Sequence, residues 1–247
     1  MKYRWNAKRR HGIHSPFIYE LTDKCFQTDI SSGDQVVLSQ TDKKLKHESR
    51  SIEITDHGAG SRRLGQRRKI SAIYRTSSSS GKYGKMLYQI ANYYKIKSSL
   101  ELGTSLGVGT LHLSLGNPKG NVTSIEGCPN TFNEAQINLK ESGLKNVQLI
   151  SGTFNEALPG FKERYDLIFI DGHHDGDALL AYLDTLIPNA HENTFFILDD
   201  IRWSASMKRA WTRIMQDERF HVTIDLFRMG IVLLRPQQEK EHFQIRL

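Results

Sequence analysis

The chain has 247 residues, of which 38% are hydrophobic and 9% aromatic, so it is long enough for one α/β domain with an extension. No apolar run approaches the roughly 18 residues that a membrane helix needs, and the basic N-terminus leads into no apolar segment. We therefore expect no membrane span and no signal peptide. Two cysteines, Cys25 and Cys128, cannot form a disulfide framework and indicate a reducing compartment, with the cytoplasm as the default.

The net charge of +7 is unevenly placed along the chain. Residues 1–85 carry 18 Lys and Arg against 8 Asp and Glu, a balance of +10. Residues 86–247 carry 16 against 19, a balance of −3. A basic N-terminal arm can bind RNA or another polyanion, although such charge is more often a solvated face.

The first elements in chain order are two helices. Ser15 as N-cap and Pro16 at the first helical position begin one helix, whose apolar stripe runs through Phe26. Residues 34–49 predict a second, more polar helix. Because their apolar stripes are thin, we expect both helices to pack on a larger domain as a cap.

A polar, glycine- and serine-rich segment follows over residues 55–82. Its composition predicts either a plain flexible linker or a mobile lid, and the pair Asp56 and His57 makes the lid worth testing. The sequence thus predicts a basic helical cap with a flexible loop or lid over residues 1–82, and a main domain over residues 83–247.

The main domain alternates helices and strands. Strands are expected at 97–102, 121–126, 146–150, 165–170, 194–198, 220–227 and 230–234, and helices at 83–94, 107–116, 131–142, 175–187 and 204–217. This alternation implies an α/β fold with a mostly parallel sheet and right-handed crossovers. The last two strands are joined tightly at Arg228 and Met229, so they are expected to pair antiparallel.

A glycine-rich turn at the end of the first of these strands marks the candidate site. Gly103, Gly107 and Gly109 let the backbone adopt positive φ, and the following helix directs its free N–H groups at the turn. Such a unit opens a nucleotide-type site at the carboxyl edge of a parallel sheet. The glycines are spaced more widely than in a dinucleotide fold, and Glu101 would repel a pyrophosphate but suit a ligand with a cationic amino-acid head.

This turn resembles motif I of the class I S-adenosylmethionine (SAM)-dependent methyltransferases. Seven strands with a terminal hairpin resemble the Rossmann-like fold of that class over about residues 83–235. Glu126 ends the second strand and can accept ribose hydroxyls, as it could equally in an NAD site. The resemblance implies that SAM contacts residues of four segments: Glu101, Gly103, Thr104, Ser105 and Gly107, then Glu126, then Thr153 and Phe154 at the adenine, and Asp171.

Carboxylates and histidines follow the fourth and fifth strands. Asp171 lies at the end of one strand, and Asp199 and Asp200 lie at the end of the next. Mg²⁺ fits such oxygen ligands. Alternatively, Asp171 pairs with the SAM amino group, and Asp199 and Asp200 cap the following helix. The Asp-Gly-x-His and Asp-Asp pattern resembles metal-dependent small-molecule and sugar O-methyltransferases, which implies these three aspartates as metal ligands and His174 as base, with His173 as the neighbouring rival.

Several functions therefore remain open. The first is SAM-dependent O-methylation of a small-molecule hydroxyl, with His174 as base and Mg²⁺ assistance as an option. The second is methylation of RNA or protein through the basic N-terminal arm. An NAD-dependent oxidoreductase and a non-catalytic nucleotide-binding module are alternatives of other classes. A homodimer is compatible with the sequence, and no membrane partner is expected.

Overall fold

A computed structural model describes residues 15–55 and 66–247 of the protein. The chain divides into two compact units. The central unit comprises Thr28–Gly160, and the terminal unit combines the described residues 15–27 with Phe161–Leu247. This division does not follow the boundary expected after residue 82. The basic lead at residues 1–12 and the pair Asp56 and His57 lie outside the described residues.

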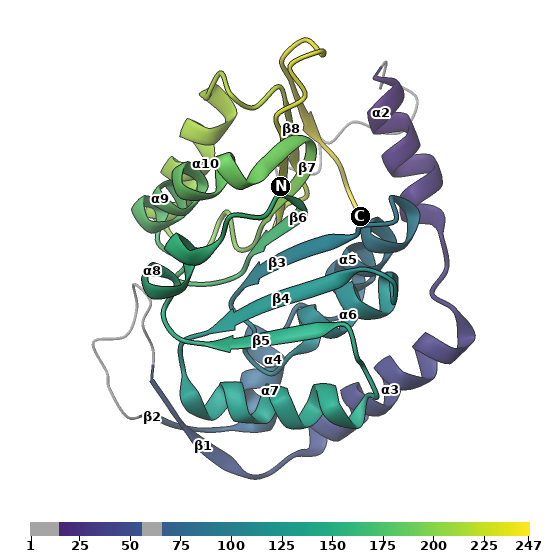
Figure 1. Ribbon diagram of the computed structural model, residues 1–247, viewed down its shortest axis with the longest axis vertical. Coiled ribbons are helices and arrows are strands. Elements are labelled where there is room, and N and C mark those ends of the chain that lie inside the picture. The colour runs from purple at the N-terminus through teal and green to yellow at the C-terminus, as the bar shows by residue number, and fades with distance from the viewer. Residues whose placement is uncertain (1–14, 56–65) are drawn as a thin grey trace. The chain divides into compact units, whose positions relative to one another are not determined.

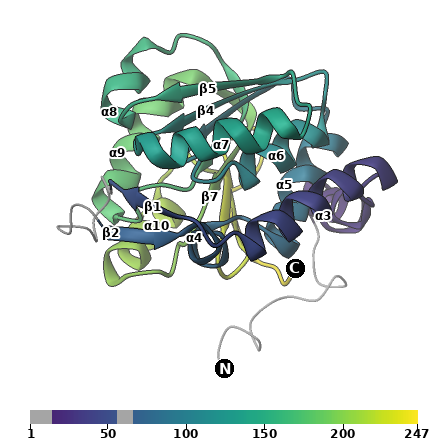
Figure 2. The same cartoon turned by 90° about the horizontal axis from the view of Figure 1, so that it is seen from below.

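The central unit alternates helices with short strands. Its elements are α3 (Ser32–His47), β1 (Ser51–Ile54), β2 (Gln66–Lys69), α4 (Ile70–Ser77), α5 (Gly81–Tyr93), β3 (Ser98–Leu102), α6 (Val108–Gly116), β4 (Asn121–Glu126), α7 (Pro129–Glu141), β5 (Val147–Ser151) and α8 (Phe154–Ala157). The strands β3, β4 and β5 pair in parallel and lie side by side (Figure 1). Helix α7 runs along β4 and β5 (Figure 2). The alternation of the sequence therefore produces the expected parallel strands.

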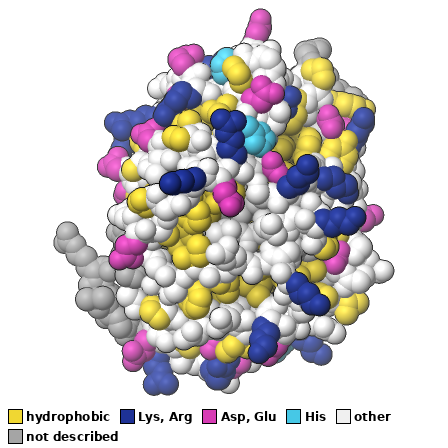
Figure 3. Space-filling view, in the orientation of Figure 1, with side chains coloured by type: hydrophobic (Ala, Val, Ile, Leu, Met, Phe, Trp, Pro, Cys, Tyr) yellow, Lys and Arg dark blue, Asp and Glu magenta, His cyan; other side chains and the backbone are white. Residues whose placement is uncertain are grey.

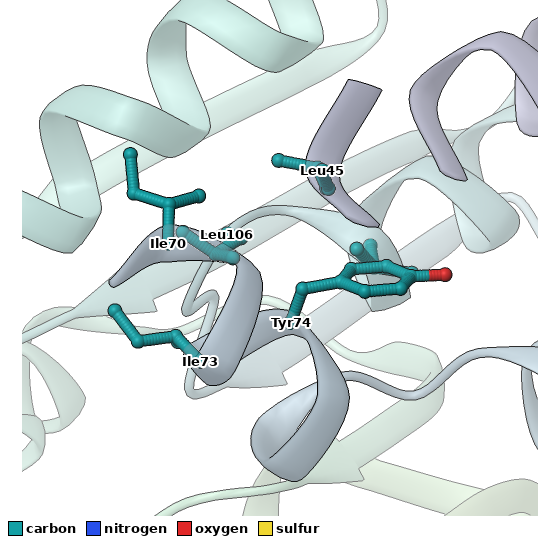
Figure 4. Close-up of a cluster of buried hydrophobic side chains, with 6 residues drawn as sticks. Leu45, Ile70, Ile73, Tyr74 and Leu106 are labelled. Atoms are coloured by element: carbon teal, nitrogen blue, oxygen red, sulfur yellow. The ribbon is translucent and has the colours of Figure 1, made fainter. Parts of the chain in front are cut away.

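The segment predicted as a flexible linker differs from that prediction where it is described. Strand β2 pairs antiparallel with β1, and α4 follows it directly. Ile70, Ile73 and Tyr74 of α4 are buried with Leu45 of α3 and Leu106 of the glycine turn, and Figure 4 shows these side chains around one small core. The i, i+3, i+4 spacing of the three α4 residues was the helical signal within the otherwise polar segment.

The terminal unit begins with the helical stretch predicted from Pro16. It consists of α2 (Pro16–Tyr19), a π-helical turn at Glu20–Lys24 and a 3-10 turn at Cys25–Gln27. Ser15 stands at the N-cap position, but its side chain makes no capping hydrogen bond to the helix. Phe17 is buried, with the guanidinium of Arg235 4.1 Å from the centre of its ring.

The remaining elements of the terminal unit form a five-stranded sheet with two long helices. They are β6 (Tyr165–Ile170), α9 (Gly176–Leu186), β7 (Ala190–Leu198), α10 (Ala205–Gln216), β8 (Val222–Asp225), β9 (Gly230–Leu233) and β10 (Glu241–Gln244), in the strand order β6-β7-β9-β8-β10. Strands β6 and β7 are parallel, and β9 pairs antiparallel with both β7 and β8. The predicted terminal hairpin is thereby confirmed.

Apart from the β1–β2 pair, the described residues of the two units form eight strands, not the seven that the sequence predicts. The additional strand is β10, which pairs in parallel with β8. It has four residues, and Phe243 is the one buried side chain among them. Such a short, mostly exposed strand gives no recognisable alternation in the sequence. Among the described helices, none is long and apolar enough to cross a membrane.

Candidate active site

The glycine-rich turn has the positive-φ backbone that its sequence predicts at two of the three glycines, whereas Gly109 lies inside α6 and is not among the positive-φ residues. Gly103 and Gly107 adopt φ values of 103° and 83°, and Ser105 between them adopts 50°. The amides of Gly103 and Thr104 both donate to the carbonyl of Ile125 on β4, which joins the turn to the neighbouring strand. Gly107 is the N-cap of α6, so the free N–H groups of that helix begin at the turn. This geometry suits close approach of a ligand to the backbone.

Glu101 lies beneath the turn and is fully buried. Its Oε2 accepts hydrogen bonds from the hydroxyls of Thr110 on α6 and Ser124 on β4, the latter at 2.5 Å. Burial raises the pKa of Glu101 to about 7, although the two hydroxyls limit the rise, and the charge of Glu126 adds to it. The side chain therefore connects strand β3 to α6 and β4. The predicted contact of Glu101 with a cationic ligand head stays a prediction.

Glu126 holds the turn from the end of β4. Its Oε2 accepts from the amide of Ser105 at 2.7 Å, and its Oε1 accepts from the amide of Cys128 at 2.8 Å. A carboxylate has about four acceptor positions, and the backbone amides of Ser105 and Cys128 use two of them. The hydroxyls of Thr104 and Ser124 also lie 2.6 Å apart beside the turn. The predicted ribose-binding residue is thus fixed against the predicted cofactor turn.

Thr153 and Phe154 follow β5, where the sequence predicts contacts with adenine. Thr153 is the N-cap of α8 and forms a capping box with Glu156. The Glu156 Oε2 accepts from the Thr153 amide at 3.0 Å and from its hydroxyl at 2.7 Å. Phe154 is buried. The predicted contacts of Thr153 and Phe154 with adenine stay a prediction.

In the terminal unit, the structure brings the predicted carboxylates and histidine together. His174 lies between two of them, with its Nε2 4.0 Å from Asp171 Oδ1 and its Nδ1 3.9 Å from Asp200 Oδ2. Its side chain is 33% exposed, and its ring centre lies 6.3 Å from that of the exposed Trp203. His174 and Asp200 adopt φ values of 39° and 51°, a left-handed conformation that is concentrated at functional sites.

The rival histidine has a different environment. His173 stacks on Tyr182 with the ring planes 13° apart, and its Nδ1 hydrogen-bonds to the Tyr182 hydroxyl. Asp175 serves as N-cap of α9 by accepting from the amides of Asp177 and Ala178. Of the two histidines, His174 is therefore the one placed between carboxylates.

The structure adds a residue that the sequence analysis did not identify. Arg228, in the turn between β8 and β9, donates from Nε to Asp199 Oδ1 at 2.9 Å and from Nη2 to Asp199 Oδ2 at 2.5 Å. Its Nε also lies 3.4 Å from Asp200 Oδ1. Burial opposes the charge of the guanidinium, but the bonded Asp199 outweighs this effect and raises the pKa of Arg228. Burial and the neighbouring Asp199 also raise the pKa of Asp200.

The two predictions for Asp199 and Asp200 both differ from this arrangement. They do not cap α10, because the N-cap is Ser204, whose side chain accepts from the amide of Met207. Nor do they fit the expected magnesium site with Asp171. Among the described residues, no group of three or more acidic, histidine or cysteine side chains is placed to hold a metal ion. Arg228 donates a hydrogen bond to each oxygen of Asp199.

Comparisons with known proteins agree with the fold. Residues 100–201 match a family model described as a methyltransferase domain. A catechol O-methyltransferase of Mycobacterium tuberculosis is 30% identical over 125 residues, which cover 49% of this chain and 56% of that protein. The chain therefore spans little more than half the length of the curated relatives that it matches.

Solved structures extend the likeness over most of the chain. An S-adenosylhomocysteine (SAH)-bound methyltransferase of Podospora anserina, PaMTH1, is similar with a TM-score of 0.62 at 16% identity, over 90% of this chain and 97% of that one. An O-methyltransferase of Bacillus cereus in complex with SAH gives a TM-score of 0.59 at 18% identity, over 86% and 94%. These findings confirm the predicted resemblance to the Rossmann-like fold of the class I methyltransferases. The resemblance to the metal-dependent members stays a prediction.

Proposed function

We propose that this protein is a SAM-dependent O-methyltransferase that acts on a hydroxyl group of a small molecule. The observation that carries the proposal is the position of His174 between Asp171 and Asp200, inside the segment that matches a methyltransferase domain. A partly exposed imidazole between two carboxylates is suited to accept a proton, because either carboxylate stabilises the imidazolium that forms.

The central unit supplies the cofactor contacts in this proposal. Glu126 accepts hydrogen bonds from the ribose hydroxyls, and the backbone of Gly103–Gly107 allows the ligand to approach closely. Thr153 and Phe154 flank the adenine, where Glu156 adds a carboxylate. Asp171 belongs to the terminal unit, and its predicted contact with the amino group of the cofactor is also part of this proposal.

The chemistry divides between the cofactor and the chain. SAM supplies an electrophilic methyl group, whose bond to the sulfonium sulfur breaks as the oxygen of the acceptor forms its bond to the methyl carbon. Before or during that attack, a ring nitrogen of His174 takes the proton of the acceptor hydroxyl. Asp171 and Asp200 orient the ring and stabilise its positive charge.

The similar proteins support the class of acceptor. The curated relatives are catechol O-methyltransferases, and other similar structures are O-methyltransferases. A small-molecule hydroxyl is therefore the acceptor that we propose. A nucleic-acid or protein acceptor stays the alternative, since the first residues of the basic N-terminal arm that would bind it lie outside the described residues. On the face drawn in Figure 3, Lys and Arg are interspersed with Asp and Glu. Cys25 and Cys128 are both buried, and no disulfide joins them. A reducing, cytoplasmic location is part of this proposal.

The first test is calorimetric titration of the protein with SAM, SAH and NAD. We expect both adenosyl ligands to bind and NAD to give no heat. Methyl transfer to a panel of catechols, sugars and other hydroxyl compounds is then followed by SAH release. Binding of NAD alone would overturn the proposal, and transfer to RNA or protein but to no small molecule would replace the acceptor class.

Two matched variants test the base. His174→Asn should lower the rate of transfer by about 10²–10⁴-fold without weakening SAH binding, because general-base catalysis contributes that much. His173→Asn is the control and should retain most of the rate, since His173 is bonded to Tyr182 instead. Equal losses in the two variants would contradict the assignment of His174.

A further inference from the structure

A guanidinium stands where the resemblance to metal-dependent O-methyltransferases places a divalent cation. We propose that Arg228 is the permanent cation of the Asp199–Asp200 pair, and that this carboxylate cluster therefore binds no divalent metal ion. This inference concerns the same site as the proposed function. Only its consequence, that methyl transfer by this protein does not depend on a metal ion, rests on the proposed function. Its test on metal binding is independent of turnover.

The geometry of Asp199 carries the argument. Its side chain is completely buried, and each carboxylate oxygen accepts a hydrogen bond from a different nitrogen of Arg228. This paired geometry is the strong, directional mode in which arginine binds a carboxylate. A metal ion would need at least one of these oxygens as a ligand at about 2.0–2.1 Å, and Mg²⁺ tolerates little departure from octahedral geometry. Asp199 cannot serve both cations.

The charge of Arg228 acts beyond Asp199. Its Nε lies 3.4 Å from Asp200 Oδ1, so one guanidinium contacts both carboxylates of the pair. A divalent ion between Asp171 and Asp200 would lie close to this fixed positive charge, which repels it. The opposite side of Asp200 faces the imidazole of His174 at 3.9 Å. The carboxylates that the sequence predicts as metal ligands are therefore already surrounded by basic groups of the chain.

The fold holds Arg228 in this position through its backbone as well. The carbonyl of Arg228 accepts from the amide of Ile201 at 3.0 Å, directly after the Asp199–Asp200 pair. The amide of Leu226 donates to the carbonyl of Met229 at 2.9 Å and closes the hairpin turn. Consequently the side chain and the main chain of Arg228 are both fixed to the end of β7. An arginine on a loose loop could move aside for a metal ion, but this one is built into the sheet.

A second arginine reinforces the same turn. Arg202 donates from both terminal nitrogens to the buried Asp225 at the end of β8, and its Nη1 also donates to the carbonyl of Phe227 at 2.9 Å. Asp225 in turn accepts from the amide of Phe227 at 2.8 Å. Phe227 has a φ of 77°, so these bonds hold the residue before Arg228 in an unfavourable conformation. The turn is therefore rigid where it presents Arg228.

Mn²⁺ is the probe for this proposal, because its electron paramagnetic resonance signal reports the free ion directly. The intact protein, with and without SAH, should leave all of the Mn²⁺ free apart from weak surface binding that salt removes. Arg228→Ala exposes the carboxylates of Asp199 and Asp200 and should raise the affinity for Mn²⁺ by about 10–100-fold, the size of effect that neighbouring groups exert on metal sites. The double variant Arg228→Ala with Asp199→Asn is the matched control and should lose that gain.

Removal of Arg228 leaves a buried carboxylate without its cation and can prevent folding. Arg228→Gln, which keeps hydrogen-bond donors but no charge, is the second variant, and thermal unfolding with and without Mn²⁺ is the second measurement. A rise in the melting temperature of either variant with Mn²⁺, absent in the wild-type protein, supports the proposal. A Mn²⁺ site in the wild-type protein that Asp199→Asn abolishes would overturn it, as would folded Arg228 variants that gain no Mn²⁺ binding.

The metal dependence of methyl transfer is measured separately from Mn²⁺ binding. If the proposed function is correct, EDTA should leave the rate of methyl transfer unchanged. A protein that binds neither SAM nor SAH would refute the proposed function, whatever the Mn²⁺ titration shows. Conversely, a Mn²⁺ site in a protein that binds SAM would refute the role of Arg228 and leave the proposed function intact.

Discussion

Replacing Glu101 with Gln should remove a loss of folding stability that the wild-type protein undergoes as the pH rises. Glu101 is 1% exposed, and burial raises its pKa to about 7 from the ordinary value of 4.5. Since the native state holds this proton more tightly than the unfolded state, the contribution of Glu101 to stability is full below about pH 4.5 and is lost as the pH rises through about 7. At about 1.4 kcal/mol per pH unit, the two pKa values correspond to a loss of about 3 kcal/mol.

The substitution isolates this effect because glutamine preserves the hydrogen bonds. Its amide oxygen can accept from Thr110 and Ser124 as the carboxylate does, but it does not ionise. Urea unfolding followed by circular dichroism, from about pH 4.5 to about pH 8, measures the difference in unfolding free energy between Glu101→Gln and the wild-type protein. Between about pH 4.5 and about pH 8, we expect the variant to become more stable relative to the wild-type protein by about 3 kcal/mol.

An exposed carboxylate provides the control. Glu163→Gln changes a side chain on the surface, so its difference from the wild-type protein should change little with pH. A difference for Glu101→Gln that is equally flat would refute the assignment of a raised pKa to Glu101, and with it the claim that this carboxylate is partly protonated near neutral pH.

Three further substitutions test the turn, the ribose contact and the hairpin. Gly107→Ala should lower the free energy of unfolding in urea by about 1–2 kcal/mol, because φ is 83° and the added Cβ would lie 3.2 Å from the Leu139 side chain. Gly143→Ala is the control and should cost less, because φ is a similar 72° but the added Cβ meets open space. An equal cost at both positions would show that the crowding is unimportant. Glu126→Gln should weaken SAH binding by about tenfold in calorimetry, since a charged acceptor is lost, and unchanged affinity would exclude the ribose contact. Arg202→Met leaves the buried Asp225 carboxylate without its cation and should cost about 3 kcal/mol in urea unfolding; a loss below about 1 kcal/mol would show that solvent replaces the pair.

The sequence was sufficient for the parts of the site that lie close together along the chain. The glycine spacing predicted the turn at Gly103–Gly107, and the acidic end of β4 predicted Glu126 as its neighbour. Both follow from local backbone requirements and from the rule that parallel strands end at one edge of a sheet. The hydroxyl partners of Glu101 could not be predicted, because Thr110 and Ser124 lie on α6 and β4. Which side chains of these two elements meet Glu101 depends on how the elements pack against β3.

The segments that were predicted poorly are those whose structure depends on distant partners. The α4 helix carries a helical spacing of apolar residues, but arginines, serines and glycines around it suggested a linker. Its burial against Leu45 and Leu106 requires α3 and the glycine turn to be in place. Strand β10 is similar, since its four residues pair with β8 and have no pattern of their own.

Arg228 shows why the electrostatic character of the cluster could not be predicted from its carboxylates alone. The three aspartates and the histidine lie within about thirty residues of one another, and their pattern resembles a metal site. Arg228 reaches Asp199 only because β9 pairs antiparallel with β7 in the register that places Gly230 opposite Leu198. A slip of one residue would direct the side chain to the other face of the sheet. A pairing register, fixed by two arginine–aspartate pairs at the hairpin, thus decides whether the same carboxylates face a metal ion or a guanidinium.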